Sequence, residues 1–279
     1  MPTHLPLRIE GVSLVPPEQR VLPEVLYKYR ETGNPWHETV ITQRELFLSS
    51  PSGFADNDDC NIPTKPELLT SAERTEWVAR TITHQFPWLA DEPAWKQHAY
   101  AQYYADYGSI NEPRHVQQVL DSSRAEFNTR FGVLCLTAEP ANAHMWNAYS
   151  GNFSGFCIGF YADTFDSYAC GPMHYVPELP VFKGNEEPEE YFANLIYVKH
   201  DQYEPEKEFR VNRFWPSKPT DDQRKIRAGR HQIAEVIIGH NAPSGFADFV
   251  RQHIPGIALR TARPDGNGGV ILEHLPDSV

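Results

Sequence analysis

The sequence predicts an α+β protein with a mixed, largely antiparallel split sheet and an inserted helical region. Short apolar or alternating runs, which are typical of strands, recur from Val25 to the end of the 279 residues. Longer runs of helical composition are gathered within about 65–130. Strands and helices do not alternate as in a parallel βαβ protein, and no internal repeat is present. We therefore expect an extended N-terminal segment at 1–24 and a single domain at 25–279.

The element predictions follow the chain in order. Strands are predicted at 25–30, 45–50, 131–137, 155–161, 173–175, 179–182, 203–214, 233–239, 257–261 and 269–275. Helices are predicted at 68–85, 93–107, 112–129, 141–149, 187–198 and 243–253. Pro93 and Pro113 suit the first turns of two of these helices, because a first-turn residue needs no backbone N–H.

The composition restricts the classes of function. The chain has 25 basic and 37 acidic residues, a net charge of −12, which argues against non-specific binding to nucleic acids or anionic membranes. It shows neither a signal peptide nor an apolar run long enough to span a bilayer, so we expect a cytoplasmic protein. The four cysteines lack C-x-x-C spacing and the histidines lack H-E-x-x-H spacing, so we expect no metal.

Two charged segments near the start of the domain have more than one reading. In the run VLYKYR, a strand places Lys28 and Arg30 on one face, either toward a ligand or as charges that protect a solvated edge strand. The edge strand is slightly favoured by the residues alone. A later loop holds Asp56, Asp58 and Asp59 but lacks the subsequent glutamate of a calcium loop, so we expect a solvated or capping loop.

Two further segments carry the remaining candidate residues. Trp146 and Tyr149 stand three apart, on one face of a short predicted helix, where their type favours core rings. A strand at 203–214 would place Glu206, Glu208 and Arg210 on one face. These side chains form either a structural ladder of ion pairs or a functional pair of carboxylates that stabilise positive charge or orient hydroxyls, with Arg210 bracing them.

Several blocks of the chain resemble a bacterial family of domains of unknown function. The blocks are LYKYR, LFLSSPSGFADNDD, LCLT, MWNAYSGNFSGFCIGF and YEPEKEFR, and the likeness covers nearly all of Val25–Leu275. That family in turn resembles a divergent branch of the ADP-ribosyltransferase superfamily, whose members bind NAD in a cleft between two small antiparallel sheets. The superfamily has a basic residue on an early strand, an aromatic or hydroxyl-bearing middle element, and a glutamate on a late strand or loop.

The resemblance implies an NAD-dependent ADP-ribosyltransferase or NAD glycohydrolase, acting as a bacterial toxin, effector or phage-defence enzyme. It implies Glu208 as the acid that stabilises the oxocarbenium-like transition state and Glu206 as the group that orients the acceptor. The residues expected to contact NAD, the substrate, are Lys28, Tyr29, Arg30, Thr137, Trp146 and Tyr149. The implied partners are an unidentified protein or nucleic-acid acceptor and an antitoxin or regulatory protein.

The sequence also departs from its relatives. Lys28 stands where they often have histidine, Arg30 where they have threonine, and Ala55 where they usually have asparagine. These departures support a second hypothesis, a non-catalytic module of the same fold that binds a nucleotide or a protein.

Overall fold

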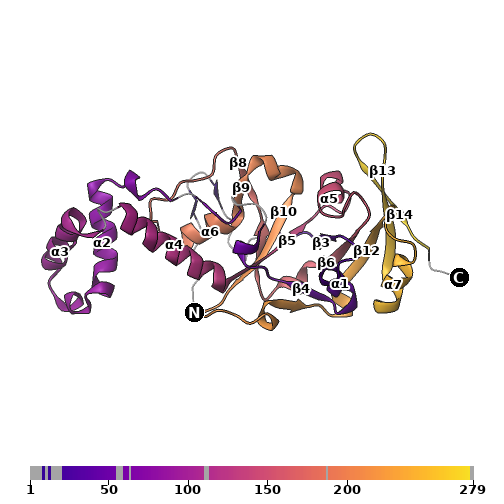
Figure 1. Ribbon diagram of the computed structural model, residues 1–279, viewed down its shortest axis with the longest axis horizontal. Coiled ribbons are helices and arrows are strands. Elements are labelled where there is room, and N and C mark those ends of the chain that lie inside the picture. Colours follow the sequence, from indigo (N-terminus) through magenta and orange to yellow (C-terminus); the bar gives the residue numbers. More distant parts are fainter. Residues whose placement is uncertain are drawn as a thin grey trace.

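The computed structural model describes residues 8–9, 12–13, 21–54, 59–62, 64–109, 113–186 and 188–276. It confirms an α+β protein with a large, mostly antiparallel sheet. The molecule is elongated, with α2 and α3 at one end and β13, β14 and α7 at the other (Figure 1). Of the described helices, none is both long and apolar enough to cross a membrane.

The main sheet has eight strands. In spatial order they are β14 (Val270–His274), β13 (Ala258–Pro264), β12 (Ile233–Gly239), β6 (Phe156–Tyr161), β3 (Val25–Arg30), β5 (Phe131–Thr137), β10 (Glu208–Phe214) and β7 (Ala169–Pro172). All neighbouring strands are antiparallel except β12 and β13, which are parallel. The long apolar runs in β5, β6 and β12 suit strands that are covered on both faces.

The sheet is almost divided between β3 and β5. These strands pair at a single position, Tyr27 with Thr137, whereas β3 pairs with β6 along its whole length and β5 with β10 along its whole length. The sheet therefore consists of a five-strand part ending at β3 and a three-strand part beginning at β5. The two strands separate on one side of the Tyr27–Thr137 pair.

Three hydrophobic clusters hold the covering elements on the sheet. One cluster joins α1 (Pro35–Thr42) and α7 (Phe246–His253) to the sheet and includes Ile41, Val250 and Phe156. A second joins α4 (Pro113–Arg130) and α6 (Pro188–Tyr197) to β5. The third joins α5 (Ala143–Ala148) to β3 and β6 through Trp146 and Cys157. The first and third clusters lie on opposite faces of β3, because Leu26 belongs to the first and Tyr27 and Tyr29 to the third.

Smaller elements complete the body. Two-stranded pairs are formed by β4 (Glu45–Phe47) with β11 (Lys225–Arg227), β8 (His174–Val176) with β9 (Val198–His200), and β1 (Arg8–Ile9) with β2 (Val12–Ser13). The 3₁₀ helices are η2 (Pro51–Gly53), η3 (Pro66–Leu68), η4 (Pro87–Asp91), η6 (Ala162–Phe165), η7 (Asp201–Glu206), η8 (Asp222–Arg224) and η9 (Arg230–Gln232).

The helical region at 65–130 has its own small core. α2 (Ser71–Gln85) begins at a capping box in which Thr70 and Glu73 satisfy each other's backbone N–H groups. α2 packs on α3 (Ala94–Tyr107), and their core cluster includes Ile82 and Ala101. Figure 1 shows these two helices projecting from the sheet, with α4 leading back toward it.

Some predictions differ from the structure. No element is predicted between 30 and 45, but α1 forms there, because Asn34 caps it and Pro35 fits its first turn. The predicted strand at 179–182 is reduced to an isolated bridge from Phe182 to Thr64. Within the N-terminal segment at 1–24, the described residues 8–9 and 12–13 form β1 and β2, and β1 contacts α6. Residues 1–7, 10–11 and 14–20 lie outside the described residues.

Candidate functional site

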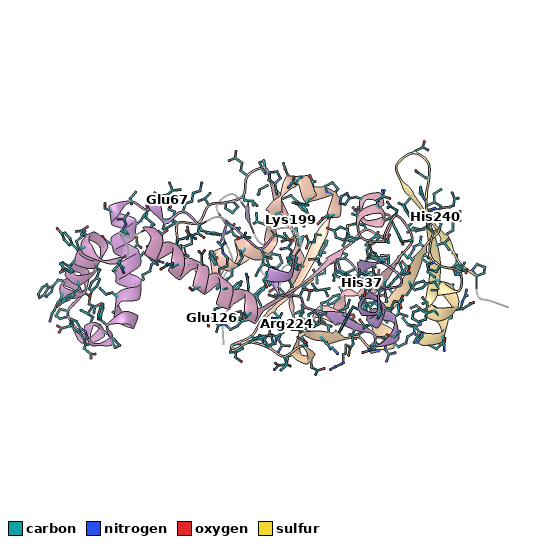
Figure 2. The ribbon with its side chains drawn as sticks, viewed as in Figure 1. His37, Glu67, Glu126, Lys199, Arg224 and His240 are labelled. Carbon is teal, nitrogen blue, oxygen red and sulfur yellow. The ribbon has the colours of Figure 1, made fainter. Side chains whose placement is uncertain are left out.

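A cavity of about 540 Å³ lies where β3 and β5 separate. This volume is within the usual range for pockets that bind small molecules. Its walls come from β3 and β5, whose junction we call the seam, and from the elements around them. The lining residues are Tyr27, Lys28, Tyr29, Arg30, His37, Phe47, Ser49, Gly53, Phe54, Asp59, Val133, Leu134, Cys135, Leu136, Met145, Tyr149, Lys199, Tyr203, Glu206 and Glu208. Figure 2 labels two of them from different elements, Lys199 of β9 and His37 of α1.

The β3 wall of the cavity is basic. Lys28 and Arg30 both line it, and the Lys28 Nζ donates a hydrogen bond of 2.8 Å to the backbone oxygen of Cys135 on β5. Burial, with Arg30 nearby, lowers the pKa of Lys28 to about 8. Burial also lowers the pKa of Arg30. Since β3 lies between β6 and β5, the interpretation of these residues as charges on a solvated edge strand is wrong.

The opposite wall is organised around the buried ammonium group of Lys199. Its Nζ lies 2.8 Å from Glu206 Oε2, 3.3 Å from Glu208 Oε2 and 3.5 Å from Asp59 Oδ2. It also lies 4.5 Å from the ring centroid of Tyr203, within range for a cation–π contact. Burial opposes its charge, but the surrounding carboxylates prevail and raise the pKa of Lys199. The group therefore stays protonated.

Glu208 is held from behind by Arg210, which is fully buried. Arg210 Nε donates to Glu208 Oε1 over 2.7 Å, and its other nitrogens donate to Asp59 and to the backbone oxygen of Ile196. Burial of the Glu208 carboxylate would raise its pKa, but Arg210 and Lys199 outweigh this and lower it to about 2. Arg210 thus braces Glu208, whereas Glu206 is held by Lys199, so the expectation that Arg210 braces the glutamates is borne out for Glu208. Glu208 is ionised at neutral pH.

Glu206 enters the same cluster from a tight turn. It ends η7, whereas the predicted strand at 203–214 begins only at Glu208. Pro205 has no backbone N–H for a sheet, and Lys207 adopts the left-handed conformation with a φ of 46°. The turn nevertheless brings both glutamates to Lys199. The prediction of one continuous strand was wrong, but the convergence of the two carboxylates was right.

Tyr149 closes this side of the cavity. Its hydroxyl donates a hydrogen bond of 2.6 Å to Glu206 Oε1, and 45% of the residue is exposed. Burial and the bond to Glu206 raise the pKa of Tyr149, so its hydroxyl remains protonated. Asn142, which caps α5, donates its side-chain amide to the Pro205 oxygen over 2.6 Å. The α5 region thus holds η7 at two points.

Trp146 does not reach the cavity. It is fully buried, stacks on Phe153 with ring centroids 5.4 Å apart, and donates its indole N–H to the Pro140 oxygen over 2.9 Å. Its ring meets that of Tyr29 edge to face at 5.1 Å. Tyr29 does line the cavity, and its hydroxyl donates to the backbone oxygen of Glu139. Trp146 supports the wall from the core and does not present a surface to a ligand.

Thr137 is likewise buried, at the point where the sheet divides. In register it stands between Tyr27 of β3 and Glu208 of β10. Its hydroxyl donates a hydrogen bond of 3.1 Å to the Lys207 oxygen, between the two glutamates. Thr137 therefore positions the acidic turn and is not among the residues that line the cavity.

Sequence reasoning missed two members of the cluster. Lys199 follows the apolar run LIYV at the end of a predicted helix, and a lysine directly after such a run is the signal that was available. Asp59 was expected to lie in a solvated or capping loop, but its side chain is buried between Arg210 and Lys199, so the solvated interpretation is wrong for this residue. Asp56, Asp58 and Ala55 lie outside the described residues. Within the described residues, no group of histidine, cysteine, aspartate and glutamate could hold a metal ion.

The cavity thus combines a basic β3 wall, an acidic wall ordered by Lys199, and several aromatic rings. Such a site suits a ligand that has anionic groups, hydroxyls and a planar ring. Comparisons of the chain with models of protein families, with curated proteins and with solved structures gave no match.

Proposed function

We propose that this protein consumes NAD, as an ADP-ribosyltransferase or an NAD glycohydrolase. The observation that carries the proposal is the convergence of Lys28, Tyr149, Glu206 and Glu208 on one cavity at the seam between β3 and β5. These residues come from separate parts of the chain. They supply an amine, a phenol and two carboxylates, which are groups that can bind NAD or act in its cleavage. A divided antiparallel sheet with its cleft at the seam also agrees with the architecture implied by the resemblance.

The chemistry is the cleavage of the bond between nicotinamide and ribose. The transition state resembles an oxocarbenium ion, so a fixed negative charge close to the ribose lowers the barrier. Glu208 supplies that charge, because Arg210 and Lys199 keep it ionised and fixed in orientation. Glu206, bonded to Tyr149, orients the accepting nucleophile or water.

The remaining lining groups bind the substrate. Arg30 supplies positive charge for the pyrophosphate, and Lys28 contacts the ribose. Tyr149 and Tyr203 offer rings beside the acidic wall for the nicotinamide. The acceptor of ADP-ribose is a protein or a nucleic acid, and the cellular role is that of a bacterial toxin, effector or phage-defence enzyme in the cytoplasm, held in check by an antitoxin or regulatory partner.

The test is nicotinamide release from NAD by the purified protein and by two matched variants. Glu208→Gln removes the proposed charge, while Glu204→Gln makes the same change on an exposed residue of η7 that pairs with Lys207. We expect Glu208→Gln to lower kcat by at least about 100-fold, the scale for losing one such electrostatic contact, and Glu204→Gln to retain activity. A wild-type protein that neither releases nicotinamide nor binds NAD refutes the proposal.

A second candidate is a non-catalytic module that binds a nucleotide in the same cavity. The observation in its favour is that both oxygens of Glu208 are already bound, one by Arg210 and the other by Lys199. Titration calorimetry with NAD separates the two functions. Binding without turnover, unchanged by Glu208→Gln, supports the module, whereas turnover that depends on Glu208 supports the enzyme.

A further inference from the structure

Lys28 and Lys199 are two lysines of one cavity with opposite surroundings. Lys199 is enclosed by three carboxylates, Asp59, Glu206 and Glu208. Lys28 is partly exposed to the cavity, and its Nζ has the backbone oxygen of Cys135 as a hydrogen-bond acceptor 2.8 Å away. A carbonyl oxygen is a much weaker partner for an ammonium ion than a carboxylate, so the Lys28 amine is the less firmly held of the two.

The charged and titratable groups around Lys28 come from every element of the cavity. They are Arg30 on the same strand, His37 on α1, Cys135 on β5, Lys199 on β9, Asp59, Glu206 on η7, Glu208 on β10 and the tyrosines Tyr27, Tyr29, Tyr149 and Tyr203. Burial and then Arg30 lower the pKa of Lys28, while Cys135, Glu208 and Glu206 raise it by less, so that it is about 8. The carboxylates are themselves engaged by Lys199 and Arg210.

A lysine in this state is a nucleophile at neutral pH. With a pKa of about 8, roughly a tenth of the Lys28 amines are neutral at pH 7, against fewer than about one in a thousand for an ordinary lysine. Desolvation and a neighbouring cation are the means by which lysines are activated for Schiff-base chemistry. Lys28 also lines the cavity of about 540 Å³, which is large enough for a small molecule.

We propose that Lys28 captures anionic aldehydes as imines, with Arg30 binding the anionic group. The amine nitrogen attacks the carbonyl carbon to give a carbinolamine, and loss of water then leaves a C=N bond. One aldehyde and one amine thus give one imine and one water, with no oxidant or reductant. On the proposed function, on which this assignment of ligand rests, the aldehyde is C1 of open-chain ADP-ribose, the product of NAD hydrolysis.

The experiment uses the wild-type protein, with pyridoxal 5′-phosphate as the anionic aldehyde and sodium borohydride to reduce the imine. Peptide mapping then measures the initial rate of labelling at each lysine at pH 7. We expect Lys28 to react at least about tenfold faster than exposed Lys218, and Lys199 to remain unlabelled because its amine is protonated and enclosed. Equal rates at Lys28 and Lys218, or no adduct at Lys28, would overturn the proposal.

Two further measurements test the role of Arg30 and the identity of the ligand. Pyridoxal without its phosphate should label Lys28 more slowly, and Arg30→Gln should abolish that difference; a difference that persists contradicts the anion-binding role. ADP-ribose in excess should protect Lys28 from labelling, and its own adduct should be trapped by borohydride at the same residue. Labelling that ADP-ribose leaves unchanged refutes ADP-ribose as the ligand.

These results are separable from the test of the proposed function. Pyridoxal phosphate labelling needs no turnover of NAD, so an inactive protein can still show selective labelling of Lys28. Conversely, nicotinamide release with no selectivity for Lys28 would overturn imine capture and leave the NAD-consuming function standing.

Discussion

Replacing Lys199 by Met should destabilise the protein by about 3 kcal/mol at pH 7. In the wild type, two cations, Lys199 and Arg210, face three carboxylates, a net charge of 2 − 3 = −1. The variant has a net charge of 1 − 3 = −2 in the same buried cluster. Removing one partner of a buried pair typically costs about 3–5 kcal/mol, because the other charge is left uncompensated.

The lowered pKa of Glu208 gives the scale of the charge compensation in this cluster. Burial raises its pKa, but Arg210 and Lys199 outweigh burial and lower it from the ordinary 4.5 to about 2, which corresponds to a net preference for the ionised form of about 3 kcal/mol. The variant retains Arg210, which limits the loss. For a chain of this size, 3 kcal/mol corresponds to a fall in Tm of about 6–12 °C.

Urea unfolding followed by circular dichroism measures the free energy of unfolding, with Lys96→Met as the control. Lys96 pairs with Glu92 at 2.7 Å on the surface, where such a pair contributes less than about 1 kcal/mol. A loss no larger than that of Lys96→Met at pH 7 would refute this account of the cluster.

Three further outcomes follow from other contacts. Because the pKa of Glu208 is lowered, its contribution to stability is complete above about pH 4.5 and should be lost as the pH falls toward 2. Between these two pH values, urea titrations should show a smaller fall in the free energy of unfolding for Glu208→Gln than for the wild type. Trp146→Phe should lower stability by about 1–3 kcal/mol through the lost bond to Pro140 and the smaller ring, with NAD affinity in calorimetry unchanged, since the ring lies behind the cavity. Gly155→Ala should be among the most damaging alanine substitutions in thermal melts, because the added Cβ would lie 2.1 Å from the backbone oxygen of Arg30.

Periodicity predicted most of the fold, because the periodic segments are also the buried ones. The apolar runs at 131–137 and 233–239 coincide with β5 and β12. The sequence did not show where β10 begins, because the run from Tyr203 to Phe214 alternates well enough for a strand and the break at Lys207 is a backbone feature. It also did not show α1, whose Gly-Asn-Pro start reads as a loop until the Asn34 cap is seen.

The candidate site was predictable only where residues share one element or a resemblance marks them. Glu206 and Glu208 are close in sequence, and Lys28 and Tyr149 were expected at the site only through the proposed resemblance. Lys199 and Asp59 come from distant segments, and their burial depends on mutual charge compensation, which no local pattern records. Trp146 and Tyr149 stand on one predicted helix face, yet one faces the core and the other the cavity, because α5 ends at Ala148 and Tyr149 is already its C-cap.

The seam between β3 and β5 also makes any ligand of the cavity a structural cross-link. The two parts of the sheet share one backbone pair, Tyr27 with Thr137. A molecule that contacts both Lys28 and Glu208 therefore adds a second connection between the two parts. Ligand at 100 times its Kd adds about 2.7 kcal/mol to the free energy of unfolding. Amide hydrogens along the facing edges of β3 and β5 are then the ones whose exchange with solvent should slow most when the cavity is occupied.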